Sequence, residues 1–196
     1  MIENSTVMEV ANDLLAIIRR DGFDPTTVRK EITAAVQPFV TSHEELEKLY
    51  FEHGIMRPEP PDRSRMLFYS PELLFMLSRY GPDFRLPTHN HESWNVLLIC
   101  RGEMHFRWYR RLDDRTVPGR ARIEIVDDLM VRTGDVAFVA KPPHDIHQLE
   151  VTQEGTWMLT VQPCHEPPQR EIYDAEEGTY EMMSLRDARE RLAALV

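Results

Sequence analysis

Cysteine, long apolar runs and positive charge are all scarce in this chain of 196 residues. The two cysteines, Cys100 and Cys164, are too few for a disulfide framework, and no CxxC pair suggests a zinc site. No run of about 18 apolar residues is available to cross a membrane. The first residues also lack the basic stretch and apolar segment of a signal peptide. These absences favour a soluble protein in a reducing, cytoplasmic setting.

The charge balance argues against a nucleic-acid partner. Asp and Glu number 33 against 23 Lys and Arg, which gives a net charge of −10 with His neutral. An acidic surface repels phosphate backbones, so we expect no binding to nucleic acid. Acidic residues are interleaved with the one arginine cluster, which therefore predicts solvated strand ends and a loop. That cluster consists of Arg107, Arg110, Arg111 and Arg115.

The first 52 residues are predicted to be helical. Thr6 and Glu9 have the spacing of a capping box, ahead of apolar residues that recur at helical intervals. Asp24 is followed by proline, which predicts the start of a second helix there. Ser42 precedes a glutamate by three residues and predicts a third, short helix. A proline-rich connector then leads to a different kind of sequence.

Short strands are predicted over residues 60–183. The segments are rich in β-branched, aromatic and aliphatic residues, and turn residues separate them, which is typical of a β sandwich or barrel. Arg101-Gly102-Glu103 predicts a tight hairpin turn. A C-terminal helix is expected over 184–196, and the whole chain, 1–196, is expected to form one mainly β domain. The predicted strand segments are RMLFYS, LLFMLSRY, WNVLLIC, EMHFRWYRRL, ARIEIV, LMVRT, DVAFVA, HQLEV and TWMLTV.

The segment PTHNHESW carries the strongest chemical signal. His89 and His91 are two residues apart, and in a strand such positions face the same side, so both imidazoles are predicted to point into one barrel interior. Two convergent neutral imidazoles suit a first-row divalent metal. His147, at the start of HQLEV, is the expected third ligand. It is preferred to His144, which follows two prolines and is predicted to lie on a turn. The histidines expected not to bind metal are His43, His53, His105, His144 and His165.

This pattern resembles the two motifs of the cupin superfamily. His-x-His is followed by Gly102, and Gly134-Asp135 then leads to His147. The resemblance covers roughly residues 60–165 and implies a double-stranded β-helix, which is a jelly-roll barrel. Within the cupins the chain is most similar to the thiol dioxygenases, namely cysteine dioxygenase and 3-mercaptopropionate dioxygenase. That resemblance implies three histidines that bind Fe(II).

The residues after His91 support a ligand set without a carboxylate. The general cupin motif places a glutamate four or five residues after the second histidine, where this chain has Asn95 and Val96. Glu92 is adjacent to His91 and is therefore expected to face the other side of the strand. A neutral ligand set leaves the metal more positive, which favours anionic ligands such as a thiolate.

Three further residues are expected to bind the substrate. Arg65 resembles the arginine that receives the substrate carboxylate in the thiol dioxygenases, and a guanidinium fork suits that task. The family also has a Ser-x-His-x-Tyr element on a late strand. The corresponding stretch here has Thr160 and Gln162 at alternate positions, without the His and Tyr. Both can hydrogen-bond a ligand, but they cannot supply the same proton chemistry. Trp94 resembles a tryptophan of the 3-mercaptopropionate branch.

Three functions remain open from the sequence. The first is an Fe(II)-dependent dioxygenase that adds O2 to the sulfur of a small thiol carboxylic acid and gives a sulfinic acid. The second keeps the site but places zinc or nickel there, for a hydrolytic, lyase or isomerase reaction. The third is a non-catalytic cupin that binds or senses a small anion, which the missing His and Tyr favour. The resemblance also leaves a homodimer open, since cupins often pair.

Overall fold

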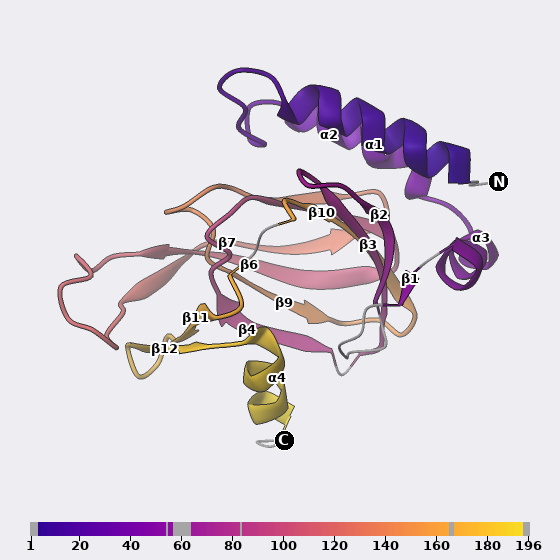
Figure 1. Cartoon of the computed structure of the whole chain (residues 1–196). Coiled ribbons are helices and arrows are strands. Elements are labelled where there is room, and N and C mark those ends of the chain that lie inside the picture. The colour runs from indigo at the N-terminus through magenta and orange to yellow at the C-terminus, as the bar shows by residue number, and fades with distance from the viewer. Residues whose placement is uncertain (1–3, 54, 57–63, 83, 165–166, 194–196) are drawn as a thin grey trace.

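Helices stand at both ends of the chain and strands fill the middle (Figure 1). The computed structural model describes residues 4–53, 55–56, 64–82, 84–164 and 167–193. In these residues no helix is both long and apolar enough to cross a membrane. The helices are α1 (Asn4–Ile18), α2 (Arg29–Val36), α3 (His43–Lys48) and α4 (Leu185–Ala193), with a 3₁₀ turn over Gln37–Phe39 and a π-helical turn over Leu49–His53.

The strands are short and all their pairings are antiparallel. In the described part of the chain they are β1 (Ile55–Met56), β2 (Ser64–Tyr69), β3 (Leu74–Tyr80), β4 (Arg85–His89), β5 (Asn95–Arg101), β6 (Glu103–Arg111), β7 (Ile123–Arg132), β8 (Val136–Val139), β9 (His147–Val151), β10 (Thr156–Gln162), β11 (Arg170–Asp174) and β12 (Thr179–Met183).

The strands form two sheets with jelly-roll connectivity. One sheet has the order β1-β2-β3-β10-β5-β8 and the other β12-β11-β4-β9-β6-β7. From β3 to β10 the chain passes back and forth between the sheets, except at the hairpin of β6 and β7. Four consecutive strands from each sheet, β3-β10-β5-β8 and β4-β9-β6-β7, therefore build the eight-stranded double-sheet jelly roll. The predicted mainly β jelly roll with helices at both ends is confirmed.

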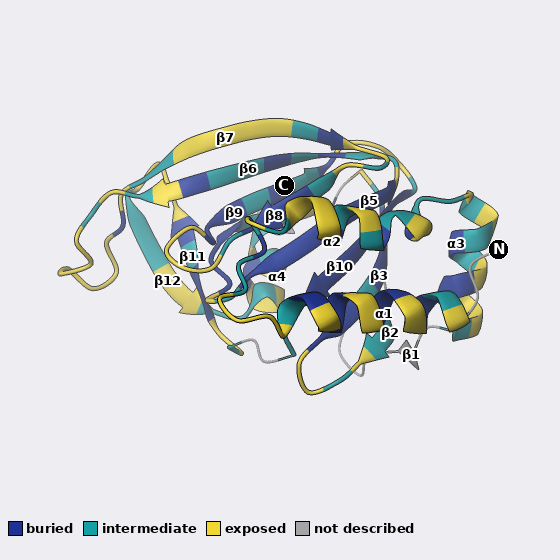
Figure 2. Cartoon of the chain, turned by 90° about the horizontal axis from the view of Figure 1, so that it is seen from above, coloured by how far each residue is buried: buried dark blue, intermediate teal, exposed yellow. Residues whose placement is uncertain are grey.

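Alternation along the strands creates two apolar layers. On β10, Trp157 and Leu159 pack in a cluster with α1, α2 and α3, whereas Met158 packs between the two sheets. On β5, Leu98 belongs to the helical side and Leu97 to the space between the sheets. Figure 2 shows α1 and α2 lying over the β3–β10–β5 sheet with their buried faces turned toward it. The helices thus cover one sheet, and the interior between the sheets is left for the site.

Of two helix starts predicted from the sequence, the structure confirms the one at Ser42 and not the one at Asp24. Ser42 caps α3 as predicted, since its hydroxyl accepts the backbone N–H of Glu45 at 3.2 Å. The prediction for Asp24 was wrong. Its carboxylate accepts the N–H and hydroxyl of Thr26 in a local turn, and α2 begins only at Arg29. An Asx turn competes with helix initiation for the same side-chain oxygen.

The turn at Gly102 is tight, but it is not a hairpin. It joins β5 to β6, and these strands lie in different sheets, so the prediction of a hairpin was wrong. Gly102 has φ +92°, and a Cβ there would lie 2.4 Å from the hydroxyl oxygen of Thr156. The segments ARIEIV and LMVRT also merge into one strand, β7. The β11–β12 hairpin was not predicted, and most of the proline-rich connector lies outside the described residues.

Candidate metal centre

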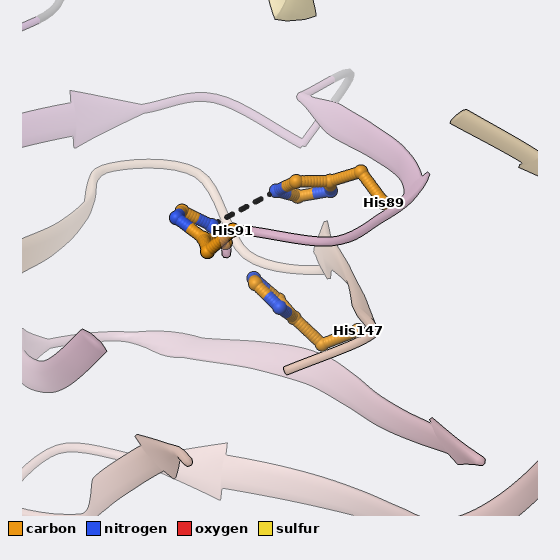
Figure 3. Close-up of side chains that lie close together, drawn as sticks. All are labelled: His89, His91 and His147. Atoms are coloured by element: carbon orange, nitrogen blue, oxygen red, sulfur yellow. Dashed lines mark hydrogen bonds between the residues drawn. The ribbon is translucent and has the colours of Figure 1, made fainter. Parts of the chain in front are cut away.

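Three histidines meet in the interior between the sheets. His89, His91 and His147 are 0%, 5% and 1% exposed, and one ligand nitrogen from each lies within 4.8 Å of the other two. Figure 3 shows the three rings turned toward a common point. Within the described residues the group contains no carboxylate and no thiolate. The predicted ligands are thus brought together, in an arrangement suited to a divalent metal.

Strand pairing places two of the three histidines. His89 is the last residue of β4 and His147 the first of β9, and the two are direct partners across the antiparallel pair. Paired residues of neighbouring strands point their side chains to the same side. Trp108 of β6 pairs with His147 from the other side. The sheet register therefore fixes two imidazoles from segments that are far apart in the sequence.

His91 is placed by a turn, so the prediction that it shares a strand with His89 was wrong. β4 ends at His89, and Glu92 adopts a positive φ of 56°. The carboxylate of Asp145, which is 2% exposed, accepts the backbone N–H groups of His91 at 3.0 Å and Glu92 at 2.6 Å. Asp145 belongs to the connection that leads into His147. One buried acid therefore ties the segment of the second ligand to that of the third.

Backbone carbonyls orient the rings of His89 and His147. Nδ1 of His89 lies 2.8 Å from the Pro87 carbonyl oxygen, and Nδ1 of His147 lies 3.1 Å from that of Asp145. A carbonyl only accepts, so each Nδ1 carries the proton and each Nε2 presents its lone pair. Hydrogen bonds of this kind fix the tautomer and direction of metal-binding histidines. Both rings are therefore ready to bind a metal through Nε2.

His91 has a cationic neighbour instead. A guanidinium nitrogen of Arg170, which is 5% exposed, lies 2.7 Å from Nδ1 of His91. Guanidinium only donates, so Nδ1 accepts and the ring proton lies on Nε2, 3.0 Å from Nε2 of His89. Binding of one metal by both Nε2 atoms replaces this shared proton. A metal on Nε2 would move the ring proton to Nδ1, which then could not accept the hydrogen bond from Arg170. Arg170 therefore favours the tautomer of His91 that does not bind a metal through Nε2.

Burial keeps His89 and His91 neutral. It lowers the pKa of His89 well below 6.5, and the charges of His147, His91 and Arg170 lower it further. Burial, followed by the charge of Arg170 and then that of His147, likewise lowers the pKa of His91. Metal binding needs the neutral imidazole, so protons compete weakly with a metal at neutral pH. Phe106 stacks on the His147 ring with centroids 5.1 Å apart and excludes water from that side.

Thr160 and Gln162 lie on the interior face of β10. Both are buried, and they alternate with Leu159 and Val161, which face the helices. Gln162 accepts a hydrogen bond from the side-chain N–H of Asn95 at 3.3 Å. Asn95 itself was not predicted to line the site, and it stands where cupins have glutamate. The structure therefore adds a polar side chain from β5 to the two predicted on β10.

Arg65 is not brought together with the histidines. It pairs with Leu77, whose side chain belongs to the helix-facing cluster, and its guanidinium lies 4.6 Å from the centroid of the Tyr50 ring. Trp94 also packs on the helical side, against Phe23. The sequence places Arg65 near the start of a strand but does not reveal which face of the sheet its side chain takes. A shift of one residue in the register would move that side chain to the other face.

The other histidines in the described residues have local roles or lie apart from the centre. His43 accepts the indole N–H of Trp157 at 3.1 Å, and His105 contacts Asp128 and Arg107. His144 is exposed on the turn before β9, as predicted. His53 is half-buried and outside the metal group, and His165 lies outside the described residues. The preference for His147 over His144 is consistent with this placement.

Sequence reasoning missed Asp145 and Arg170. Asp145 lies inside PPHDIH, two residues before a predicted ligand, and an acidic residue at that spacing was the available signal. No signal marked Arg170, because β11 was not predicted and only pairing with the β4 end brings it to His91.

No known protein family matches the chain, and no curated protein matches it by sequence. Similar solved structures include KdgF from Halomonas sp., at 13% identity and a TM-score of 0.43, covering 58% of this chain and 90% of that one. A cupin-2 domain protein from Shewanella frigidimarina NCIMB 400 has 12% identity and a TM-score of 0.40, covering 65% and 97%. Hydroquinone 1,2-dioxygenase from Sphingomonas sp. TTNP3 has 11% identity and a TM-score of 0.41, covering 54% and 68%. Likeness at this level carries no argument about the reaction.

The jelly-roll topology and the buried histidines define the class of this protein. It is a two-sheet jelly roll with a buried three-histidine group that could hold a metal ion.

Proposed function

We propose that this chain is a non-haem Fe(II) dioxygenase that adds O2 to the sulfur of a small thiol carboxylic acid. The thiol R–SH and O2 combine to R–SO2H, so all the electrons come from sulfur and no further reductant is needed. The observation that carries the proposal is the ligand set, which is three neutral imidazoles without a carboxylate in the described residues. Such a set leaves a metal more positive and favours an anionic thiolate.

Fe(II) held by His89, His91 and His147 would bind both a thiolate and O2. The chain's own residues bury this site. His89 and His147 are held by carbonyls, and Phe106 covers one ring, so the donor atoms are fixed before substrate arrives. Arg170 adds a positive charge beside the centre, which favours an anionic substrate. Thr160 and Gln162 are proposed to hydrogen-bond the substrate from β10.

Arg65 has no supporting contact for the role expected of it. Its guanidinium packs on Tyr50 on the helical side of the sheet. Arg65→Met tests the expectation directly. An unchanged KM for thiol acids would remove Arg65 from the site, and a rise of tenfold or more would restore it.

Anaerobic purification, elemental analysis and an O2 electrode test the proposal. We expect about one iron per chain and O2 uptake with at least one small thiol acid, matched by sulfinic acid. His147→Ala is expected to abolish metal binding and uptake. His144→Ala is the matched control, since His144 is exposed outside the group and its loss should leave both unchanged. Iron-loaded protein that consumes no O2 with any thiol acid would contradict the proposal.

A second candidate is a non-catalytic cupin that binds a small anion. The interior face of β10 offers Thr160 and Gln162 and no residue there that readily moves a proton. Iron-loaded protein that binds thiol acids without O2 uptake would favour this function. Stoichiometric zinc or nickel in the purified protein would instead favour a hydrolytic, lyase or isomerase reaction.

A further inference from the structure

One buried oxygen in the described residues has no hydrogen-bond partner. It is Oδ1 of Asn95, at the start of β5, and the residue is 3% exposed. The amide nitrogen of the same side chain donates to Oε1 of Gln162, which fixes the direction of the amide. Buried acceptors in native proteins are nearly always paired, so an unpaired one calls for a specific explanation.

The strand ends place Asn95 on the interior side of the sheets, where the three histidines also lie. Asn95 pairs with Val139 of β8, and the chain from there leads to His147, while β4 ends at His89 just before β5 begins. Asn95 shares its face of β5 with Leu97, which packs between the sheets in the same cluster as Phe106. Phe106 in turn stacks on His147. Asn95 therefore lies on the sheet opposite His89 and His147, on the same interior side as these histidines.

A carbonyl oxygen in this position selects ligands by what they donate. An O–H or N–H donor removes the cost of the unpaired acceptor, whereas a bare carboxylate or an aliphatic chain does not. A thiol is a poor donor, so the sulfur of a thiol substrate does not meet this need. The donor must be a further group on the ligand.

We propose that Asn95 is a ligand-binding residue that selects small acids carrying a hydroxyl or ammonium group on their carbon chain. Its Oδ1 accepts the hydrogen bond, and Gln162 holds the amide in that orientation. The inference rests on the metal centre of the proposed function, and it does not depend on the oxidation of sulfur. For a thiol dioxygenase, it favours amino or hydroxy thiol acids over unsubstituted ones.

Binding of two-carbon acids to the Co(II)-loaded protein tests the proposal without turnover. Acetate, glycolate and glycine have almost the same size, and they differ in having no donor, a hydroxyl or an ammonium group. Visible absorption of Co(II) reports binding of each. Glycolate and glycine can also chelate a metal, so the decisive quantity is the change in each affinity when Asn95 is replaced.

Asn95→Leu removes the acceptor at nearly constant size. We expect the affinity for glycolate, glycine or both to fall about tenfold and the affinity for acetate to fall less than twofold. The larger loss identifies whether the donor is a hydroxyl or an ammonium group. Ser78→Ala is the matched control, because Ser78 is a buried polar residue on β3 that pairs with Met158, and no ratio should change. Asn95→Asp retains an acceptor and adds charge. It should strengthen glycine relative to glycolate, so the proposal stays testable if the leucine variant does not fold.

The outcomes separate two failures. Two results would overturn the selection by Asn95 and leave the metal centre intact, provided that Co(II) still binds. One is an equal loss of affinity for all three acids in Asn95→Leu. The other is an unchanged ratio of the glycine and glycolate affinities in Asn95→Asp. Failure of the wild-type protein to bind Co(II) would overturn the metal centre and the selection together.

Discussion

The carboxylate of Asp145 accepts the backbone N–H of His91, and this bond joins the two halves of the metal centre. The same carboxylate accepts the N–H of Glu92, and the carbonyl of Asp145 receives Nδ1–H of His147. The turn that presents one ligand is therefore built around a residue that also orients another.

Replacing Asp145 should weaken metal binding. Asp145→Ala leaves the His91–Glu92 turn without its acceptor, and the affinity for Co(II) is expected to fall about 10- to 100-fold, the usual effect of removing a group that orients a ligand. Asp145→Asn should lower the Co(II) affinity less than Asp145→Ala, because the amide oxygen can still accept a backbone N–H. Asp135→Ala is the control, because Asp135 accepts the N–H of Arg132 in a turn outside the metal group. Equal Co(II) affinities in all three variants would show that Asp145 has no positioning role.

Replacing Arg170 should have the opposite effect on the metal. Its guanidinium donates to Nδ1 of His91 and repels a cation, so Arg170→Met is expected to raise the Co(II) affinity about tenfold or more. The same variant should bind anions more weakly at the loaded centre. Arg101→Met serves as the comparison, since Arg101 is exposed at the end of β5. A drop in Co(II) affinity in Arg170→Met would mean that the guanidinium supports the ligand set.

Gly102 should be among the glycines least tolerant of substitution. Gly102→Ala combines a positive φ with a Cβ that would lie 2.9 Å from Cα of Thr156, and a loss of about 2–4 kcal/mol in unfolding free energy is expected. Gly119 also has a positive φ, of +75°, but a Cβ there meets nothing within 4 Å. Gly119→Ala should therefore cost only about 1–2 kcal/mol. Urea unfolding of both variants measures the difference, and equal losses would rule out the contact with Thr156.

Asp113 should contribute to stability against acid. The hydrogen bonds from Arg111, followed by those from the backbone of Arg122 and Arg115, hold the pKa of Asp113 well below 3.8, although burial opposes them. A lowered folded-state pKa stabilises the protein above the ordinary value of 3.8. The contribution is lost as the pH falls from that value through the lower one. Asp113→Asn should cost about 1.5–3 kcal/mol at pH 7, and the deficit should shrink below pH ~4. A deficit that stays constant down to pH ~2 would contradict this origin.

The sequence by itself indicated the three histidines of the candidate site and the class of fold. Short strands separated by turns predicted a mainly β barrel, and the spacing of His89, His91 and His147 predicted the metal centre. The strand and turn pattern and the close spacing of His89 and His91 are properties of neighbouring positions, whereas His147 was chosen because it begins a predicted strand.

Only the tertiary structure decided how the site is held and what faces it. His91 reaches the centre through a turn fixed by Asp145, and Arg170 arrives from a strand that the sequence did not reveal. Arg65 takes the helical face, while Asn95 takes the interior one. Register between strands distant in the sequence chooses the face of each side chain, and no local pattern contains that information.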